Sequence, residues 1–169
     1  MKILVTGGAG YIGSILTPML VDAGHHVTAV DNMLYGQNTL AHLCGNPNFE
    51  VHRVDVRNGA AIKPFLKSAD IIIPLAALVG APLCDLNPVD AELVNLKHPL
   101  ELFTMLSKDQ VVIMPTTESA YGSNADVCTE ETTINPLSTY AKHKAHVEQA
   151  LMERDNSISL RLAPVYGMS

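Results

Sequence analysis

The chain of 169 residues is long enough for one domain with a substantial hydrophobic core, and 47% of its residues are hydrophobic. Its formal charge of −6 and its scattered Lys and Arg residues exclude the concentrated basic surface of a nucleic-acid-binding protein. No apolar run is long enough for a transmembrane helix, and the first residues do not have the pattern of a signal peptide, so we expect no membrane partner.

The N-terminal residues predict a strand, a glycine-rich turn and a helix in that order. Residues 2–5 are apolar, and residues 12–20 have the apolar spacing of a helix. Between them, Gly7 permits a tight turn, Gly10 permits close approach of a pyrophosphate, and Gly13 permits close packing of the helix on the sheet. The helix N-terminus would add free N–H groups and a positive dipole end. The pattern predicts a phosphate-binding cradle, with an ordinary glycine-rich turn as the alternative.

The second predicted strand, residues 27–30, ends in Asp31. In dinucleotide-binding units an acidic residue about 20 residues after the glycines accepts hydrogen bonds from the adenosine ribose hydroxyls. The Asp31 carboxylate would repel a 2′-phosphate, and no Lys or Arg follows it before Arg53. We therefore expect NAD rather than NADP as the cofactor, with a solvated carboxylate at a strand end as the alternative.

Strand and helix patterns alternate along the rest of the chain. They predict strands at residues 49–54, 70–75, 110–114 and 157–162, and helices at residues 58–67, 88–106 and 136–153. Pro18 and Pro99 fall inside predicted helices and should bend them, because proline has no N–H to donate. The alternation predicts an α/β fold of the Rossmann type, which is a doubly wound parallel sheet with helices on both faces.

The cysteines and histidines give no pattern of a metal site. Cys44, Cys84 and Cys128 are odd in number and widely spaced, which is typical of reduced thiols and not of a disulfide framework. The seven histidines do not have the spacing of metal ligands. We therefore expect no metal and a cytoplasmic location.

The candidate catalytic residues lie in the second half of the chain. Tyr140 and Lys144 are four residues apart, which places them on one face of a predicted helix. The ordinary pKa of tyrosine is about 10, and an adjacent ammonium with a positive nicotinamide ring would lower it toward neutral pH. Thr117, at the end of the fifth strand, would project into the crevice at the carboxyl ends of the strands and hold a reacting oxygen. A solvated helix face is the alternative for the Tyr140 and Lys144 pair.

With these motifs in this order, the sequence resembles the extended short-chain dehydrogenase/reductases, in particular the NAD-dependent sugar-nucleotide epimerase/dehydratase family. The resemblance runs through the whole chain and includes the opening motif, residues 6–14, and the pair Tyr140 and Lys144. It implies a set of cofactor-binding residues: Gly7, Gly10, Tyr11, Ile12, Gly13, Asp31, Asn32, Asp55, Val56, Leu75, Ala76, Ala77, Asn95, Tyr140 and Lys144.

The resemblance also implies an activity, the epimerisation of a nucleotide-sugar through a transient keto intermediate with NAD as the cofactor. Tyr140 would act as the acid and base, Lys144 would hold the nicotinamide ribose and lower the pKa of Tyr140, and Thr117 would hydrogen-bond the reacting oxygen. Related proteins dimerise through the helices that would follow Ala91 and Pro136, so a homodimer is expected.

Two departures from the family pattern concern the reaction. Dehydratases follow the catalytic threonine with Asp and then Glu, whereas Glu118 and Ser119 follow Thr117 here. This difference disfavours dehydration and leaves epimerisation or simple oxidation. Pro164 replaces an Asn or Thr expected near the nicotinamide and offers no hydrogen-bond donor. The alternatives to an epimerase are an NAD-dependent sugar or alcohol dehydrogenase and a catalytically silent NAD-binding regulator.

Members of the family continue past the sixth predicted strand into a smaller C-terminal region that holds the nucleotide-sugar. That substrate region is absent from this chain of 169 residues. We therefore interpret residues 1–169 as the NAD-binding Rossmann domain of a longer protein, with a natural truncation as the alternative.

Overall fold

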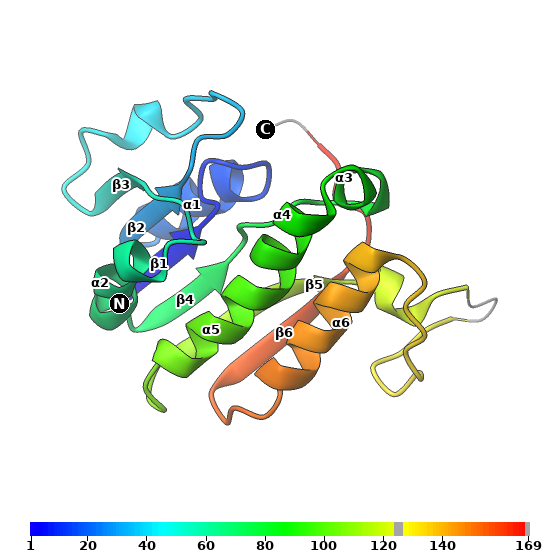
Figure 1. Ribbon diagram of the computed structural model, residues 1–169. Helices are drawn as coiled ribbons and strands as arrows, with labels where there is room; N and C mark the ends of the chain where they lie inside the picture. The colour runs from blue at the N-terminus through cyan, green and yellow to red at the C-terminus, as the bar shows by residue number, and fades with distance from the viewer. Residues whose placement is uncertain (124–126, 168–169) are drawn as a thin grey trace.

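A computed structural model describes residues 1–123 and 127–167. Its centre is a parallel sheet of six strands in the order β3-β2-β1-β4-β5-β6 (Figure 1). The strands are β1 (Lys2–Thr6), β2 (His26–Asp31), β3 (Phe49–Arg53), β4 (Ile71–Pro74), β5 (Val111–Thr117) and β6 (Ser157–Leu162). The direction of winding reverses between β1 and β4, which is the topological switch point where ligands bind in such sheets. The predicted fold class is confirmed.

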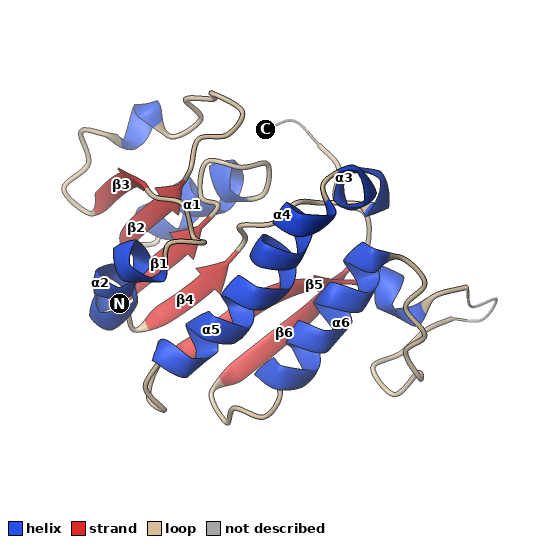
Figure 2. Cartoon of the chain, in the orientation of Figure 1, coloured by secondary structure: helices blue, strands red, loops and turns tan. Residues whose placement is uncertain are grey.

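Helices lie on both faces of the sheet (Figure 2). α1 (Gly13–Asp22) covers one face, and α2 (Gly59–Ser68), α5 (His98–Met105) and α6 (Thr139–Leu151) cover the other. The shorter helical segments are α3 (Ala81–Leu86), α4 (Pro88–Glu92), the 3-10 turns η1 (Ala41–Leu43) and η3 (Glu118–Tyr121), and the π-helical segment η2 (Leu93–Lys97).

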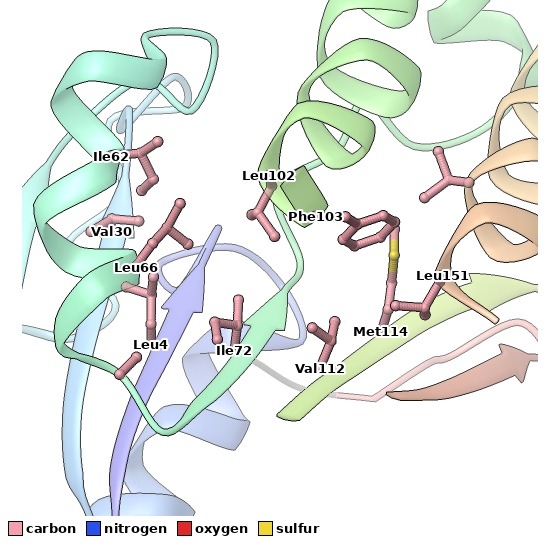
Figure 3. Packing of buried hydrophobic residues seen from close by; sticks show 12 residues of the cluster. Leu4, Val30, Ile62, Leu66, Ile72, Leu102, Phe103, Val112, Met114 and Leu151 are labelled. Carbon is pink, nitrogen blue, oxygen red and sulfur yellow. The ribbon is translucent and has the colours of Figure 1, made fainter. Parts of the chain in front are cut away.

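Successive residues of each strand point to opposite faces and fill two hydrophobic clusters. Leu4, Ile72 and Val112 pack against α2, α5 and α6, where they contact a layer that includes Ile62, Leu66, Leu102, Phe103 and Leu151 (Figure 3). Ile3, Val5, Val27 and Ile73 pack on the α1 side. Because both faces are buried, strands such as residues 71–73 are apolar at every position.

The helices differ from the sequence prediction in two places. The segment around Gly80, for which no helix was predicted, contains α3; Pro82 occupies its first turn, where the N–H has no partner within the helix in any case. The single helix predicted for residues 88–106 consists of α4, η2 and α5. η2 ends directly before α5, whose first turn holds Pro99, so the irregularity expected from Pro99 takes the form of a π-helical turn. α1 runs through Pro18 without interruption.

Candidate active site

The glycine turn after β1 is packed too closely for side chains at two of its glycines. Gly7 has a φ of +69°, and a Cβ at this position would lie 2.6 Å from the amide nitrogen of Ala76. A Cβ on Gly13 would lie 2.5 Å from the carbonyl oxygen of Gly8. The turn therefore brings backbone, rather than side chains, to the N-terminus of α1.

This N-terminus offers backbone donors to a ligand. No side chain caps α1, and within residues 1–123 and 127–167 the amide N–H groups of Tyr11 and Ile12 have no hydrogen-bond acceptor. Free N–H groups and the helix dipole together favour an anion at this position.

Asp31 lies at the end of β2 and forms a hydrogen bond with the glycine turn. One carboxylate oxygen accepts a hydrogen bond from the Ala9 N–H at 3.1 Å, and the other accepts one from the Met33 N–H at 2.8 Å. Each oxygen keeps a lone pair for a further donor. The carboxylate is therefore oriented toward the turn, as its predicted role requires.

One open cavity of about 770 Å³ runs along the carboxyl ends of the strands. Of the predicted cofactor-binding and catalytic residues, all except Asn95 line it: Gly7, Gly10, Tyr11, Ile12, Gly13, Asp31, Asn32, Asp55, Val56, Leu75, Ala76, Ala77, Thr117, Tyr140 and Lys144. Residues that are far apart in the sequence thus line the same cavity, including those of the glycine turn and of the helix that carries Tyr140.

Asn95 lies outside the lining of this cavity. It is fully buried in η2, and its side-chain oxygen accepts a hydrogen bond from the Leu78 N–H at 2.9 Å. Its Nδ2 donates to the Leu78 carbonyl at 2.7 Å and contacts the Cys84 Sγ at 3.4 Å. Asn95 therefore supports the loop that lines the cavity after β4, and a direct contact with a cofactor stays a prediction.

Asp55 follows β3 and is paired with Arg57. The guanidinium donates to both carboxylate oxygens, at 2.9 and 2.6 Å, and reaches Asp90 at 2.6 Å. Hydrogen bonding from Arg57 lowers the pKa of Asp55 to about 2, so the carboxylate stays charged across the physiological range.

The candidate catalytic residues come from two elements. Thr117 ends β5, is 7% exposed, and accepts a hydrogen bond from the Ser119 N–H at 3.1 Å. Tyr140 and Lys144 lie on α6, whose first turn is capped by the Ser138 hydroxyl accepting from the Ala141 N–H at 3.1 Å. Lys144 is only 4% exposed, and all three candidate side chains line the cavity.

Burial dominates the charge states at this end of the cavity. It raises the pKa of Tyr140 above its ordinary value, and a Cys84 thiolate would raise it further. Burial lowers the pKa of Lys144 to about 8. The lowering that we expected from an adjacent ammonium together with a positive nicotinamide ring concerns the protein with its cofactor bound, and it stays a prediction.

The sequence analysis missed three features around the cavity. The Cys84 thiol is fully buried near Tyr140 and Lys144, and its pKa is raised by burial. The Tyr11 hydroxyl donates to the Gly167 carbonyl at 2.7 Å and joins the glycine turn to the segment after β6. Gln37 lines the cavity with a buried side-chain oxygen that has no partner among the described residues. No local pattern in the sequence indicates these features, since each depends on how distant segments pack.

The described residues contain neither a metal-binding cluster nor a membrane-spanning helix. In residues 1–123 and 127–167, no group of His, Cys, Asp and Glu side chains is arranged to hold a metal ion. No helix in the same part of the chain is long and apolar enough to cross a membrane.

The model of the family described as the NAD dependent epimerase/dehydratase family matches residues 3–169. The chain belongs to this family. UDP-glucuronic acid decarboxylase 1 of Arabidopsis thaliana is 30% identical over 98% of the chain and 39% of its own length. A UDP-glucose 4-epimerase of Cyamopsis tetragonoloba is 30% identical over 87% of the chain and 45% of its own length.

The solved structure of the enzyme WbmG from Bordetella bronchiseptica in complex with NAD matches this member of the family with a TM-score of 0.85 and 26% identity. The match covers 99% of this chain and 54% of that one. The chain thus spans about two fifths of the curated relatives and half of the solved structure that it matches.

Proposed function

We propose that residues 1–169 form an NAD-binding Rossmann domain, and that the complete protein uses NAD to epimerise a nucleotide-sugar. The observation that carries the proposal is the single cavity shared by the glycine turn and by Thr117, Tyr140 and Lys144. The close packing of Gly7 and Gly13 supports a backbone cradle for a pyrophosphate.

The residues at the other end of the cradle fit the adenosine half of NAD. The Asp31 carboxylate would accept hydrogen bonds from the ribose hydroxyls. The Gln37 side-chain oxygen, which has no partner in residues 1–123 and 127–167, offers a second acceptor on the same cavity. Bound NAD would supply the acceptor and later the donor of hydride. A 2′-phosphate would meet the Asp31 charge, so we infer a preference for NAD over NADP.

Tyr140 is the proposed acid and base. Its phenolate would remove the proton of a sugar hydroxyl. After the keto-sugar has rotated in the site to present its other face, the phenol of Tyr140 would return a proton to it. Thr117 would donate a hydrogen bond to the reacting oxygen. Lys144 would supply positive charge to the phenolate, which burial otherwise disfavours, and would bind the nicotinamide ribose.

Epimerisation is favoured over dehydration by the residues after Thr117. Glu118 and Ser119 both line the cavity, so a serine stands where the resemblance places the glutamate that handles elimination of water. A serine hydroxyl cannot act as that acid and base at neutral pH.

Decarboxylation of a nucleotide-linked uronic acid is the second candidate function. The observation that favours it is the 30% identity to an Arabidopsis thaliana UDP-glucuronic acid decarboxylase over 98% of the chain. Both reactions begin with oxidation of the sugar by NAD, so the same three catalytic side chains serve either one. An NAD-dependent sugar or alcohol dehydrogenase and a silent NAD-binding regulator remain the alternatives from the sequence.

The reaction products formed by the complete protein distinguish these candidate functions. We expect it to purify with NAD bound, to convert a UDP-hexose to its epimer by proton NMR, and to accumulate no NADH. Release of carbon dioxide from a UDP-hexuronate would establish the second candidate instead. Stoichiometric NADH would identify a dehydrogenase, and NAD binding without turnover of any nucleotide-sugar would contradict the enzyme proposal.

We also infer a homodimer from the family resemblance, through the helices after Ala91 and Pro136. Light scattering on the purified protein tests it, and a monomeric mass at micromolar concentration would contradict it.

A further inference from the structure

Behind the candidate catalytic residues, α6 and β6 are joined by a partly buried ion pair. Glu148 of α6 and Arg161 of β6 have side chains that are 10% and 20% exposed. The Arg161 Nε and Nη2 atoms lie 2.8 and 2.7 Å from the same Glu148 carboxylate oxygen. Two guanidinium nitrogens thus share one carboxylate oxygen, and these two contacts restrict the orientation of both side chains.

The remaining groups of this pair reach two further elements. The other Glu148 oxygen accepts a hydrogen bond from the Thr116 hydroxyl of β5 at 3.0 Å, and that hydroxyl also meets the Ser159 hydroxyl at 3.1 Å. The Arg161 Nη1 donates to the Tyr121 hydroxyl of η3 at 3.0 Å, and the guanidinium lies 5.0 Å from the centre of the Tyr121 ring. Both carboxylate oxygens therefore have partners.

The network touches the two elements that carry the candidate catalytic residues. Tyr140, Lys144 and Glu148 follow one another at intervals of four on α6, so they share one helix face. Thr116 directly precedes Thr117 at the end of β5. α6 lies along β5 and β6 (Figure 1), and the bond between Thr116 and Glu148 ties it to the strand end at the cavity.

Stability alone is a weak explanation for this arrangement. Removing two charges from water costs about as much as their attraction returns, and apolar residues of the same volume often stabilise a protein as well or better. A buried ion pair does impose one geometry on the elements that it joins, because each misalignment leaves a charge without a partner. The network is therefore suited to fixing the position of α6 on the sheet.

We propose that Glu148 is a positioning residue that, through Thr116 and Arg161, fixes the distance of Tyr140 and Lys144 from Thr117. This inference rests on the proposed function, because it assumes that these three side chains act on one substrate. Misplacement of reacting groups by about 1 Å can reduce a rate by as much as a hundredfold.

The test compares two buried threonines in the complete protein. Thr116→Val removes the hydroxyl that joins β5 to Glu148 with little change in volume. Thr17→Val is the matched control, because Thr17 is fully buried in α1 and its hydroxyl has no partner among the described residues. We expect Thr116→Val to lower kcat roughly tenfold, with the KM for the nucleotide-sugar and the affinity for NAD changed less than about twofold. Thr17→Val should leave all three unchanged.

A second readout does not depend on turnover. The titration of Tyr140 can be followed by phenolate absorbance, with Tyr140→Phe subtracted, in the absence and presence of NAD. The titratable groups near Tyr140 are Cys84 on α3, which affects the pKa of both Tyr140 and Lys144, and Lys144 itself, one turn further along α6. NAD should lower the pKa of Tyr140 in the wild type, and Thr116→Val and Glu148→Gln should reduce this drop. Glu148→Asp, which keeps the charge, should restore part of it.

The outcomes separate this inference from the proposed function. A drop of equal size in wild type, Thr116→Val and Glu148→Gln, or losses of melting temperature without a change in kcat, would overturn the positioning role. No NAD-induced drop in the wild type itself would overturn the proposed mechanism at Tyr140 instead.

Discussion

The two ends of the cavity are built in different ways. At the cofactor end, backbone atoms of one short turn carry the geometry, and Gly7 and Gly13 are needed because no side chain fits there. At the proposed catalytic end, the strand β5, the helix α6 and the strand β6 are joined by side-chain bonds of Glu148 to Thr116 and Arg161. Local sequence therefore determines the first end, whereas contacts between distant segments determine the second. Substitutions at the cofactor end should therefore mainly lower stability, and substitutions at the proposed catalytic end should mainly lower turnover.

The largest expected effect is on turnover at the catalytic end. In the complete protein, Tyr140→Phe should lower kcat by on the order of a thousandfold, because it removes the proposed acid and base of the reaction. The affinity for NAD measured by calorimetry should stay within about twofold of the wild type, since the phenol is used mainly in the transition state. Normal turnover by this variant would contradict the assigned role of Tyr140.

At the cofactor end the largest effect should be on stability. Gly7→Ala combines an unfavourable positive φ with a Cβ that would lie 2.6 Å from the Ala76 backbone nitrogen. We expect the free energy of unfolding in urea to fall by about 3 kcal/mol. Gly24→Ala is the control, because Gly24 also has a positive φ of +83° but a Cβ at this position would have no atom within 4 Å. It should cost only about 1 kcal/mol, and equal losses would refute the packing argument.

Burial of the charged Lys144 side chain should lower the free energy of unfolding. Its pKa falls from 10.5 to about 8 on folding, so below pH 8 both states carry the charge and the full cost is present. Between these two values the unfolded chain binds more protons, and stability therefore rises with pH. Lys144→Met should raise the free energy of unfolding at neutral pH by up to about 3 kcal/mol and flatten this rise.

The exposed Lys142 on the same helix provides the control for this measurement. Lys142→Met should leave the pH dependence of unfolding unchanged. A Lys144→Met protein that is less stable than the wild type at neutral pH would show that the ammonium is stabilised by its surroundings rather than destabilised by burial.

The smallest effect should come from the contact between the Tyr11 hydroxyl and the Gly167 carbonyl, which joins the glycine turn to the segment after β6. Tyr11→Phe removes one hydrogen bond, so NAD should dissociate roughly threefold faster in stopped-flow measurements. Tyr166→Phe removes a hydroxyl from the neighbouring residue, which is 93% exposed, and should not change the rate. Identical rates in all three proteins would show that the contact does not retain the cofactor.

Most of the fold could be predicted because it depends on local patterns. Continuous apolar runs such as residues 71–73 indicate strands that are buried on both faces, and α2 begins after its cap Asn58, within a residue of the predicted start. α3 was missed because Gly80 and Pro82 are typical of loops, although proline also suits the first turn of a helix.

The site was less predictable where its parts come from distant segments. The motif residues gather on the cavity, but Asn95 supports the Leu78 backbone from outside it. The burial that raises the pKa of Tyr140 could not be predicted either, because desolvation depends on packing that no spacing of residues reveals. The network around Glu148 left one trace in the sequence, its interval of four from Lys144.

The most direct test of the central claim is the affinity of this chain for NAD and NADP, measured by calorimetric titration of wild type, Asp31→Ala and Asp31→Asn. We expect the wild type to bind NAD well and NADP at least about tenfold more weakly, because the Asp31 carboxylate would accept hydrogen bonds from the ribose hydroxyls and repel a 2′-phosphate. Asp31→Ala should lose most of the NAD affinity, whereas Asp31→Asn, which keeps an acceptor oxygen without the charge, should mainly lose the discrimination. Equal affinity of the wild type for the two cofactors, or no binding of either, would contradict the account.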